Sequence, residues 1–549
     1  WRRDFHAHPE AGWTEFRTAA LIIRRLRELG YAIRMGEAAC ASDRRMGVPS
    51  SAVLAAARKR ALEHGADAEL VAGMGDGYTG FWADLDCGPG PVTAFRFDMD
   101  CNEVAECAEE SHRPVREGFA SRWPGLMHAC GHDGHAAVGL GLAEVLVSIR
   151  RHLRGRIRLI FQPAEEGARG ALPMSEAGAV DGVDVLFGFH IGFKAEGPGS
   201  LICGTQGFLA TTKRDVLFSG VPAHAGAAPE EGKDALLAAC SAVVNLHAIS
   251  RNGKGGTRIA VGRLEGGEAR NVIPASARLF METRGETTEL DAYMTAESER
   301  ILRASADLWG CACEWRTVGN SAGGGSSPEL ARLIATVAEA MGGWKTVIPM
   351  SGFGATEDFA CLMSRVQASG GLASYLQVGT DRAAGHHSDR FDFDETCLGR
   401  ALELLARLAV RMAGGGQEDT ETETESDMEF LDEVVRRKGI HVQLWLEGED
   451  GEGFGRGRVE LLQLVDELGS LSKAAKQLGM SYRGAWGKIK KAERIAGETL
   501  VDASGTKRDG YSLTPAGREL VQRFQQWYAD VESFAKKRAE ALFSDFDKE

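Results

Sequence analysis

The stretch RIRLIFQPAEEG, residues 156–167, decides the fold. Its first half is a short apolar run of the kind that forms a buried strand, and it ends in a proline and two adjacent glutamates. Two further runs, AFRFDMD at 94–100 and DVLFGFHI at 184–191, predict buried strands of the same kind. Residues 136–150, which lie between AFRFDMD and RIRLIFQP in the chain, show helical periodicity. This alternation predicts an α/β fold with a largely parallel sheet.

Outward from this core, the order of elements changes between residues 205 and 320. The patterns predict a strand at 212–220, a helix at 234–250, strands at 257–265 and 275–285, a helix at 289–309 and a strand at 313–318. This is the order of a ferredoxin-like domain. We therefore expect residues 206–320 to be inserted into an α/β domain made of residues 1–205 and 321–412. Residues 37–84, with a helix near 50–64, would elaborate that domain.

The composition is that of a soluble globular protein with several domains. The chain has 549 residues, more than one hydrophobic core usually organises, and a formal net charge of −14 that argues against a nucleic-acid-binding main body. No run approaches the roughly 20 apolar residues of a membrane span. Eleven scattered cysteines and the absence of a secretion signal favour free thiols in the cytoplasm. Because the sequence opens on Trp1, we expect its start to be missing.

Four separate segments carry residues able to bind a divalent cation, each at or after a predicted strand or in a tight turn. These residues are Cys130, His132 and His135 in MHACGHDGH, Glu165 and Glu166 in QPAEEG, His190 in FGFHIG, and His386 and His387 in AGHHSDRF. Asp98 and Asp100 on a strand are suited to orienting imidazoles behind the ligands. Taken singly, a lone histidine is more often structural and a buried cysteine is usually an inert thiol. Their joint pattern predicts a metal centre assembled by folding.

Several motifs resemble the M20 metallopeptidase family, in its amidohydrolase branch. They are MHACGHDGHAA, FQPAEEG, HAGAAPEEGKDALLAA, RNVIPAS and GHHSDRFDFDE. Within that family the segments RRDFHAHPEAGWTEFRTA, RRMGVP, TGFWADLD and GTDRAAGHHSDRFDFDE are most similar to the A-subunit group of p-aminobenzoyl-glutamate hydrolases, along nearly all of residues 1–412. The resemblance implies an aminopeptidase-like catalytic domain that holds two divalent ions, Zn or Mn, and an inserted lid that also makes a dimer contact.

The resemblance also assigns roles to residues. It implies that the metal ligands are Cys130, His132, Glu166, His190 and His387, with His386 the poorer of its pair because the family ligand directly precedes a position like Ser388. Glu165 would be the general base that accepts a proton from the attacking water. His224, from the lid of a partner subunit, would stabilise the oxyanion, with Asn271 as a weaker companion. Arg270 and Lys213 are possible partners of a substrate carboxylate.

The C-terminal part is separated by AGGGQEDTETETESDME, within residues 413–430, which we interpret as an acidic linker. Beyond it, residues 457–494 predict three short helices with Gly479 in a tight turn, and residues 498–517 a two-stranded wing with Lys507 and Arg508 at its tip. Residues 434–543 resemble the winged helix-turn-helix domain of ModE-type regulators, without their molybdate-binding domain. The expected base contacts are Ser481, Tyr482 and Arg483, and the expected phosphate contacts are Lys488 and Lys490.

Three hypotheses follow. The favoured one is an amidohydrolase of N-acyl amino acids with an appended DNA-binding module, since every position that the resemblance makes catalytic is filled. The chain would act on p-aminobenzoyl-glutamate, or on other conjugates such as hippurate-like or indole-acetyl amino acids, as a homodimer or with a related B subunit. The alternatives are a DNA-binding regulator that uses the hydrolase domain as a ligand sensor, and a hydrolase whose C-terminal module serves only oligomerisation.

Overall fold

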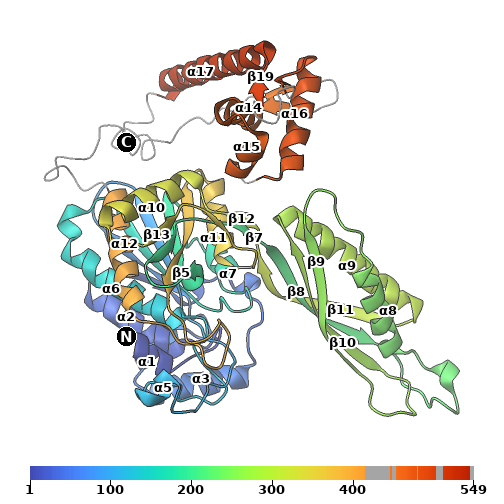
Figure 1. Cartoon of the computed structure of the whole chain (residues 1–549). Helices are drawn as coiled ribbons and strands as arrows, with labels where there is room; N and C mark the ends of the chain where they lie inside the picture. The colour runs from blue at the N-terminus through green and yellow to red at the C-terminus, as the bar shows by residue number, and fades with distance from the viewer. Residues whose placement is uncertain (414–444, 448–452, 479, 503–510, 544–549) are drawn as a thin grey trace. The chain divides into compact units, whose positions relative to one another are not determined.

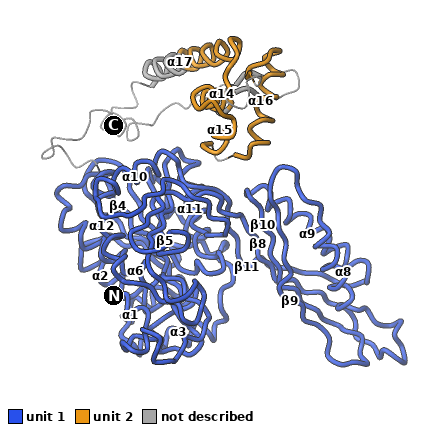
Figure 2. Tube along the Cα trace, in the orientation of Figure 1, with its two compact units in different colours: residues 1–419 blue, residues 420–549 orange. Residues whose placement is uncertain are grey.

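The computed structural model describes residues 1–413, 445–447, 453–478, 480–502 and 511–543. The chain divides into two compact units, residues 1–419 and 420–549, which are described separately (Figure 2). No helix among the described residues is long and apolar enough to cross a membrane. The predicted linker and the wing tip with Lys507 and Arg508 lie outside the described residues, as does Gly479.

The first unit is built around an eight-stranded sheet (Figure 1). Its strands, in spatial order, are β1 (Ala32–Met35), β2 (Phe81–Asp86), β4 (Arg156–Gln162), β3 (Val92–Asp98), β5 (Val185–Glu196), β15 (Leu372–Thr380), β6 (Ser200–Ile202) and β13 (Thr346–Ile348). The four central strands β4, β3, β5 and β15 are mutually parallel, and β6 pairs in parallel with β13. The contacts β1–β2, β2–β4 and β15–β6 are antiparallel. The sheet is therefore mixed, and the expectation of a largely parallel sheet holds only for its centre.

Outside residues 206–320, the first unit contains ten described α-helices. They are α1 (Arg2–Ala7), α2 (Phe16–Glu28), α3 (Ser51–Glu63), α4 (Ala68–Gly73), α5 (Arg113–Arg116), α6 (His132–Ser148), α7 (Ala171–Glu176), α10 (Pro328–Met341), α11 (Phe359–Ala368) and α12 (Thr396–Met412). Of these, α2, α6, α10, α11 and α12 contact the sheet. The central helix α6 approaches β3 and β4 closely at Gly139, where a Cβ would lie 2.8 Å from the Phe97 ring and 2.9 Å from the Phe161 ring. A larger residue would push the helix off the sheet. The helix begins at His132, so His132 and His135 occupy its first turn rather than the loop before it.

The strand order places a topological switch at β3. The chain passes from β3 through α6 to β4 on one side, and β5 then pairs with the other side of β3. Ligands of open α/β sheets bind beyond the carboxyl ends of the strands at such a point. The segments that follow β3, β4, β5 and β15 therefore meet at one edge of the sheet.

A second sheet of four antiparallel strands forms the inserted lid. Its order is β11 (Ala312–Ser321), β8 (Ala210–Ser219), β10 (Ser276–Gly285) and β9 (Thr257–Gly266), with α8 (Ala235–His247) and α9 (Thr288–Leu308) packed against it. This is a ferredoxin-like arrangement. The lid joins the main unit near the short strands β7 (Thr205–Phe208), β12 (Gly324–Gly325) and β14 (Ser351–Gly352). The exact domain boundaries given above stay predictions.

The second unit contains the expected three helices and a long fourth one. They are α14 (Arg456–Leu468), α15 (Leu471–Gln477), α16 (Tyr482–Ala496) and α17 (Pro515–Phe543). Two short strand pairs accompany them, β16 (Trp445–Glu447) with β17 (Gly453–Gly455) and β18 (Val501–Asp502) with β19 (Ser512–Leu513). Buried leucine, valine, alanine and isoleucine side chains from α14, α15 and α16 form its core. The hydroxyl of Ser481 accepts the Gly484 N–H at 3.1 Å and caps α16.

Candidate metal centre

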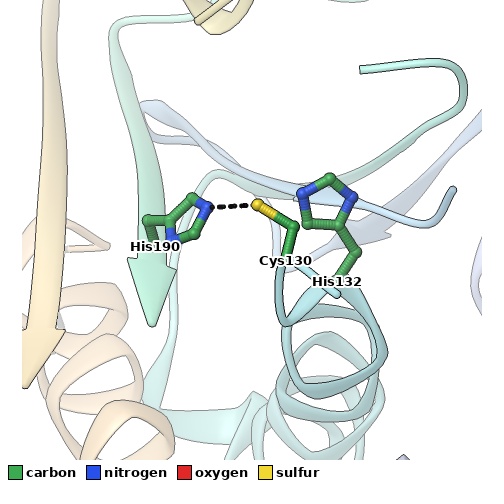
Figure 3. Close-up of side chains that lie close together, drawn as sticks. All are labelled: Cys130, His132 and His190. Carbon is green, nitrogen blue, oxygen red and sulfur yellow. Dashed lines mark hydrogen bonds between the residues drawn. The ribbon is translucent and has the colours of Figure 1, made fainter. Parts of the chain in front are cut away.

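The first group of ligand atoms lies between α6 and β5. Cys130, His132 and His190 each place one donor atom within 4.8 Å of the others, and all three side chains are buried. Figure 3 shows Cys130 and His132 at the start of α6 facing His190 at the strand, and Cys130 Sγ is 3.4 Å from His190 Nε2. Residues 60 positions apart in sequence thus meet because β5 ends beside the N-terminus of α6.

Backbone carbonyls fix which nitrogen of each imidazole points into the group. His132 Nδ1 lies 2.9 Å from the Asp100 carbonyl oxygen, and His190 Nδ1 lies 2.9 Å from the Ile191 carbonyl oxygen. A carbonyl oxygen can only accept, so Nδ1 carries the proton in both rings and Nε2 is left with a lone pair. This tautomer is the one that a metal requires.

The second group consists of Cys130, Glu166 and His387, again with donor atoms within 4.8 Å of one another. His387 Nε2 is 3.2 Å from Glu166 Oε1. The backbone N–H of His387 donates to the Ala129 carbonyl at 2.8 Å, and its φ of 64° is a left-handed conformation that a histidine rarely adopts. The tie to Ala129 brings His387 next to Cys130. Cys130 therefore belongs to both groups of donor atoms.

Two other histidines lie close by but are already occupied. His386 has Nδ1 at 2.8 Å from an Arg382 nitrogen and Nε2 at 3.2 Å from the Ile191 carbonyl. His135 has Nδ1 at 2.6 Å from Asp98 Oδ1, and its Nε2 accepts the Ile191 N–H at 2.9 Å. Neither ring has a nitrogen left for a cation in this arrangement. The structure thus separates His387 from His386 by their contacts.

The aspartates at the end of β3, Asp98 in the strand and Asp100 just after it, hold the surroundings in place. Asp100 accepts the backbone N–H groups of Glu165 and Glu166, at 3.0 Å to Oδ1 and 2.9 Å to Oδ2. Asp100 thus fixes the backbone of both glutamates, and one carboxylate oxygen of each lies within 4.8 Å of the other and of a His132 ring nitrogen. Asp98 hydrogen-bonds His135 and lies 3.8 Å from His132 Nδ1, so its direct imidazole partner is not one of the proposed ligands.

Glu165 is partly buried beside the first group, with Oε2 3.9 Å from His132 Nε2. Burial raises the pKa of Glu165 well above its usual range, and the nearby carboxylates of Glu357, Glu166 and Asp358 raise it further. A carboxyl with raised proton affinity is suited to accept a proton and return it.

Sequence reasoning missed the group behind Glu165. The Arg96 guanidinium is fully buried and lies 2.5 Å from Asp98, 3.0 Å from Glu357 and 3.3 Å from Asp358. The Tyr375 hydroxyl donates to Glu357 Oε2 at 2.5 Å. The available signal was Arg96 itself, because an arginine inside the apolar strand FRF must be buried with acidic partners. Nothing local in the sequence indicated which acids those are.

The residues fit divalent cations. His132 Nε2 and Glu166 Oε1 are buried and have no hydrogen-bond partner in the described part of the chain, although His387 lies at ion-pair distance from Glu166. Orphaned lone pairs inside a protein are costly unless something binds them. One thiol, imidazoles and a carboxylate form a donor set that suits Zn and also accommodates Mn.

His224 and Asn271 lie on the lid, and the structure does not bring them to the metal groups of the same chain. His224 Nδ1 accepts the N–H groups of Gly226 and Ala227 at 3.1 Å, and the Asn271 carbonyl accepts the Ala225 N–H at 3.0 Å. The lid contacts the loop after Glu166 at its other end, where the Asn320 N–H donates to the Ala168 carbonyl.

The length of the lid strands separates the two ends. Asn320 is opposite Thr212 in the register, whereas Ala312 is opposite Ser219, five residues before His224. Seven residue steps along β8 span roughly 23 Å. His224 is therefore far from the Glu165–Glu166 loop of its own chain.

In the second unit, the five predicted DNA contacts are exposed along α16 and its N-cap: Ser481, Tyr482, Arg483, Lys488 and Lys490. Lys490 Nζ is 2.7 Å from Glu493 Oε2, so its charge is partly neutralised. The Tyr482 hydroxyl lies 2.9 Å from that of Tyr511, which ties the start of the helix to the base of the wing.

Comparison with known proteins decides the family. Residues 94–411 match the model of the peptidase family M20/M25/M40. The chain belongs to this family. It is 45% identical over 412 residues, 75% of this chain, to both the indole-3-acetyl-aspartic acid hydrolase of Enterobacter agglomerans and the A subunit of the p-aminobenzoyl-glutamate hydrolase of Escherichia coli K12, covering 94% of each. This M20 chain is a metal-dependent amidohydrolase.

Among solved structures, the M20 chain resembles the Bacillus subtilis YXEP protein, described as a dinuclear metal-binding peptidase from the M20 family. The two are 25% identical with a TM-score of 0.52, and the match covers 76% of this chain and 97% of the other. Residues 457–518 match the helix-turn-helix model of the lysR family of bacterial regulatory proteins. The expected helix-turn-helix is thus confirmed, whereas the assignment to the ModE type is corrected to the lysR family.

Proposed function

We propose that this M20 chain hydrolyses the amide bond between an aromatic acyl group and an acidic amino acid, with p-aminobenzoyl-glutamate as the foremost substrate. The observation that carries the proposal is the pair of donor groups that share Cys130, with the partly buried Glu165 beside them. The names of the two relatives supply the substrate class, since each joins an aromatic acyl group to aspartate or glutamate.

In this proposal Cys130, His132 and His190 form one metal site, and Cys130, Glu166 and His387 form the other. Divalent ions held there, Zn or Mn, would act as Lewis acids toward the attacking water and the amide carbonyl. His132 and His190 are held in the ligand tautomer by the Asp100 and Ile191 carbonyls.

Glu165 performs the proton transfers. Its carboxylate accepts a proton from the attacking water, and the water oxygen forms a bond to the amide carbon. The protonated Glu165 then donates that proton to the amide nitrogen as the carbon–nitrogen bond breaks. The products are the aromatic carboxylic acid and the free amino acid. Arg270 and Lys213 stay candidate partners of the amino acid's carboxylates.

His224 would serve the site of a partner subunit. Its Nδ1 accepts two backbone N–H groups, so Nε2 carries the proton in the neutral ring and can donate to an oxyanion. The strand length between His224 and the metal groups of its own chain supports a contribution across a dimer, either of two copies of this chain or with a related B subunit. Asn271, adjoining His224 across the Ala225 contact, would assist.

The decisive test is hydrolysis by the purified full chain with added Mn or Zn, followed by a chelator. We expect release of p-aminobenzoate from p-aminobenzoyl-glutamate that stops when the ions are removed and returns when they are restored. Activity on other N-acyl amino acids alone would retain the mechanism and reject the substrate. Inactivity on every amide, with bound metal present, would reject the hydrolase proposal for the isolated chain and favour the ligand-sensor alternative.

For the C-terminal unit we propose DNA binding, because Arg483 and Lys488 are exposed on α16, the helix that enters the major groove in helix-turn-helix proteins. Mobility shifts of duplex DNA over a salt series test this, since phosphate contacts give an affinity that falls as salt rises. If the chain does not bind DNA, or if its affinity for DNA does not change with salt, a module used only for oligomerisation is favoured. Binding to DNA and eleven free cysteines fit a cytoplasmic protein.

A further inference from the structure

Strand β5 becomes irregular after Ile191, the residue next to His190. In the pairing of β5 with β15, Ile191 is opposite Val378, but the next paired residues are Glu196 and Thr380. Gly379 alone therefore faces residues 192–195, which arch out of the ladder. Bulges of this kind re-aim side chains and are frequent beside active sites.

Phe193 lies in this arch in a left-handed backbone conformation, with φ of 62°, after Gly192 with φ of 74°. This conformation suits glycine, but for a bulky residue it is costly. The arch is held from both sides, because the Lys194 N–H donates to Gln377 Oε1 at 2.9 Å and Lys194 Nζ donates to the Gly352 carbonyl at 2.8 Å. Backbone strain that the surroundings enforce is concentrated at functional sites.

The arch places the Phe193 ring against the metal centre. The ring centroid is 5.7 Å from that of His190 and 5.5 Å from that of His386. Its other contact is a stack on Phe353, with centroids 4.5 Å apart and planes at 22°. Phe353 is buried and continues to Phe208 and Tyr375 in the core, whereas Phe193 is only partly buried. Phe193 packs on the edge of this core, yet part of its ring stays exposed beside His190 and His386, where it can contact another molecule.

We propose that Phe193 is the residue that recognises the aromatic acyl group of the substrate. The inference rests on the proposed function, in which the scissile carbonyl is placed at the ions held by His190 and its fellow ligands. Aromatic rings stack or meet edge to face over about 4.5–7 Å. Because the Phe193 centroid is 5.7 Å from that of His190, an aryl ring attached to that carbonyl would come within reach of Phe193. Phe193 would select aromatic over small aliphatic acyl groups.

The test compares two substrates that share a leaving group, p-aminobenzoyl-glutamate and N-acetyl-glutamate, with wild-type protein, Phe193→Ala and Phe193→Gly. We expect kcat/KM for the aromatic substrate to fall about tenfold in both variants, while the value for the acetyl substrate changes less than about twofold. Both variants lose the stack on Phe353, but glycine adopts the Phe193 conformation without strain, so Phe193→Gly should have a higher thermal midpoint than Phe193→Ala. The matched control is Phe280→Ala on the lid strand β10, which should leave kcat/KM for both substrates unchanged.

An equal loss on both substrates would overturn the inference and make Phe193 a structural residue. A binding measurement on the metal-loaded full chain, with p-aminobenzoate and acetate, distinguishes failure of the proposed function from failure of this inference. If neither acyl-glutamate is hydrolysed, weaker binding of p-aminobenzoate to Phe193→Gly than to wild type still supports the aryl contact. Wild-type protein that binds p-aminobenzoate no better than acetate would refute it.

Discussion

Replacing Glu165 with glutamine removes the proposed proton acceptor while preserving the size of the side chain. A positioned general base contributes about 100- to 10,000-fold to a rate, or about 2.7–5.5 kcal/mol of the barrier. The structure favours the upper half of this range, because the neighbouring acids cannot take over. Glu357 is held by Arg96 at 3.0 Å and by the Tyr375 hydroxyl at 2.5 Å. We therefore expect kcat to fall at least about 1000-fold, on the order of 4 kcal/mol.

Glu166 provides a matched control, since it is the adjacent residue of the same type. Both glutamates are anchored by backbone N–H groups to Asp100, which neither substitution removes. Glu165→Gln should retain two bound ions per chain by elemental analysis and lose turnover, whereas Glu166→Gln should lose metal and turnover together. The assay is release of p-aminobenzoate at saturating substrate. Glu165→Gln with more than a tenth of wild-type kcat, or with its metal lost, would refute the assignment of the base.

Three further predictions follow. His224→Ala should lower kcat roughly 100- to 1000-fold with metal content unchanged, and mixing it with Glu165→Gln after subunit exchange should restore activity; unrestored activity would argue against a contribution across subunits. Burial lowers the pKa of His128 to about 3 from its ordinary 6.5, so its contribution to folding stability is intact above pH 6.5 and is lost as the pH falls from 6.5 toward 3. Between pH 7 and 5, the free energy of unfolding of His128→Leu should therefore fall by about 2 kcal/mol less than that of the wild type, as measured by denaturant unfolding. Lys488→Ala should weaken binding to all DNA sequences alike and reduce the salt slope by about 1 in a titration, whereas a change confined to one sequence would mean base contact.

The sequence predicted the order of strands and helices well, because hydrophobic periodicity is a local property. The run RIRLIFQ became β4 and DVLFGFHI lies within and next to β5, as expected from continuous apolar runs. It did not predict that the sheet is mixed, because the direction of β2 relative to β4 depends on how the insertion at residues 37–84 returns to the sheet. Nor did it reveal Glu357 as a partner of Arg96, because Glu357 is 261 residues away in the sequence.

What the sequence by itself determined is the kind of chemistry: a thiol, imidazoles and a carboxylate pair, each near the end of a strand or the start of a helix, where local pattern fixes position. Tertiary structure decided how these groups are shared. It put Cys130 in both donor groups, gave His386 to backbone and arginine contacts, and left His387 beside Glu166. It also set His224 at the far end of the lid and lifted Phe193 out of β5. These outcomes depend on strand pairing and register, which are fixed only when distant segments pack together.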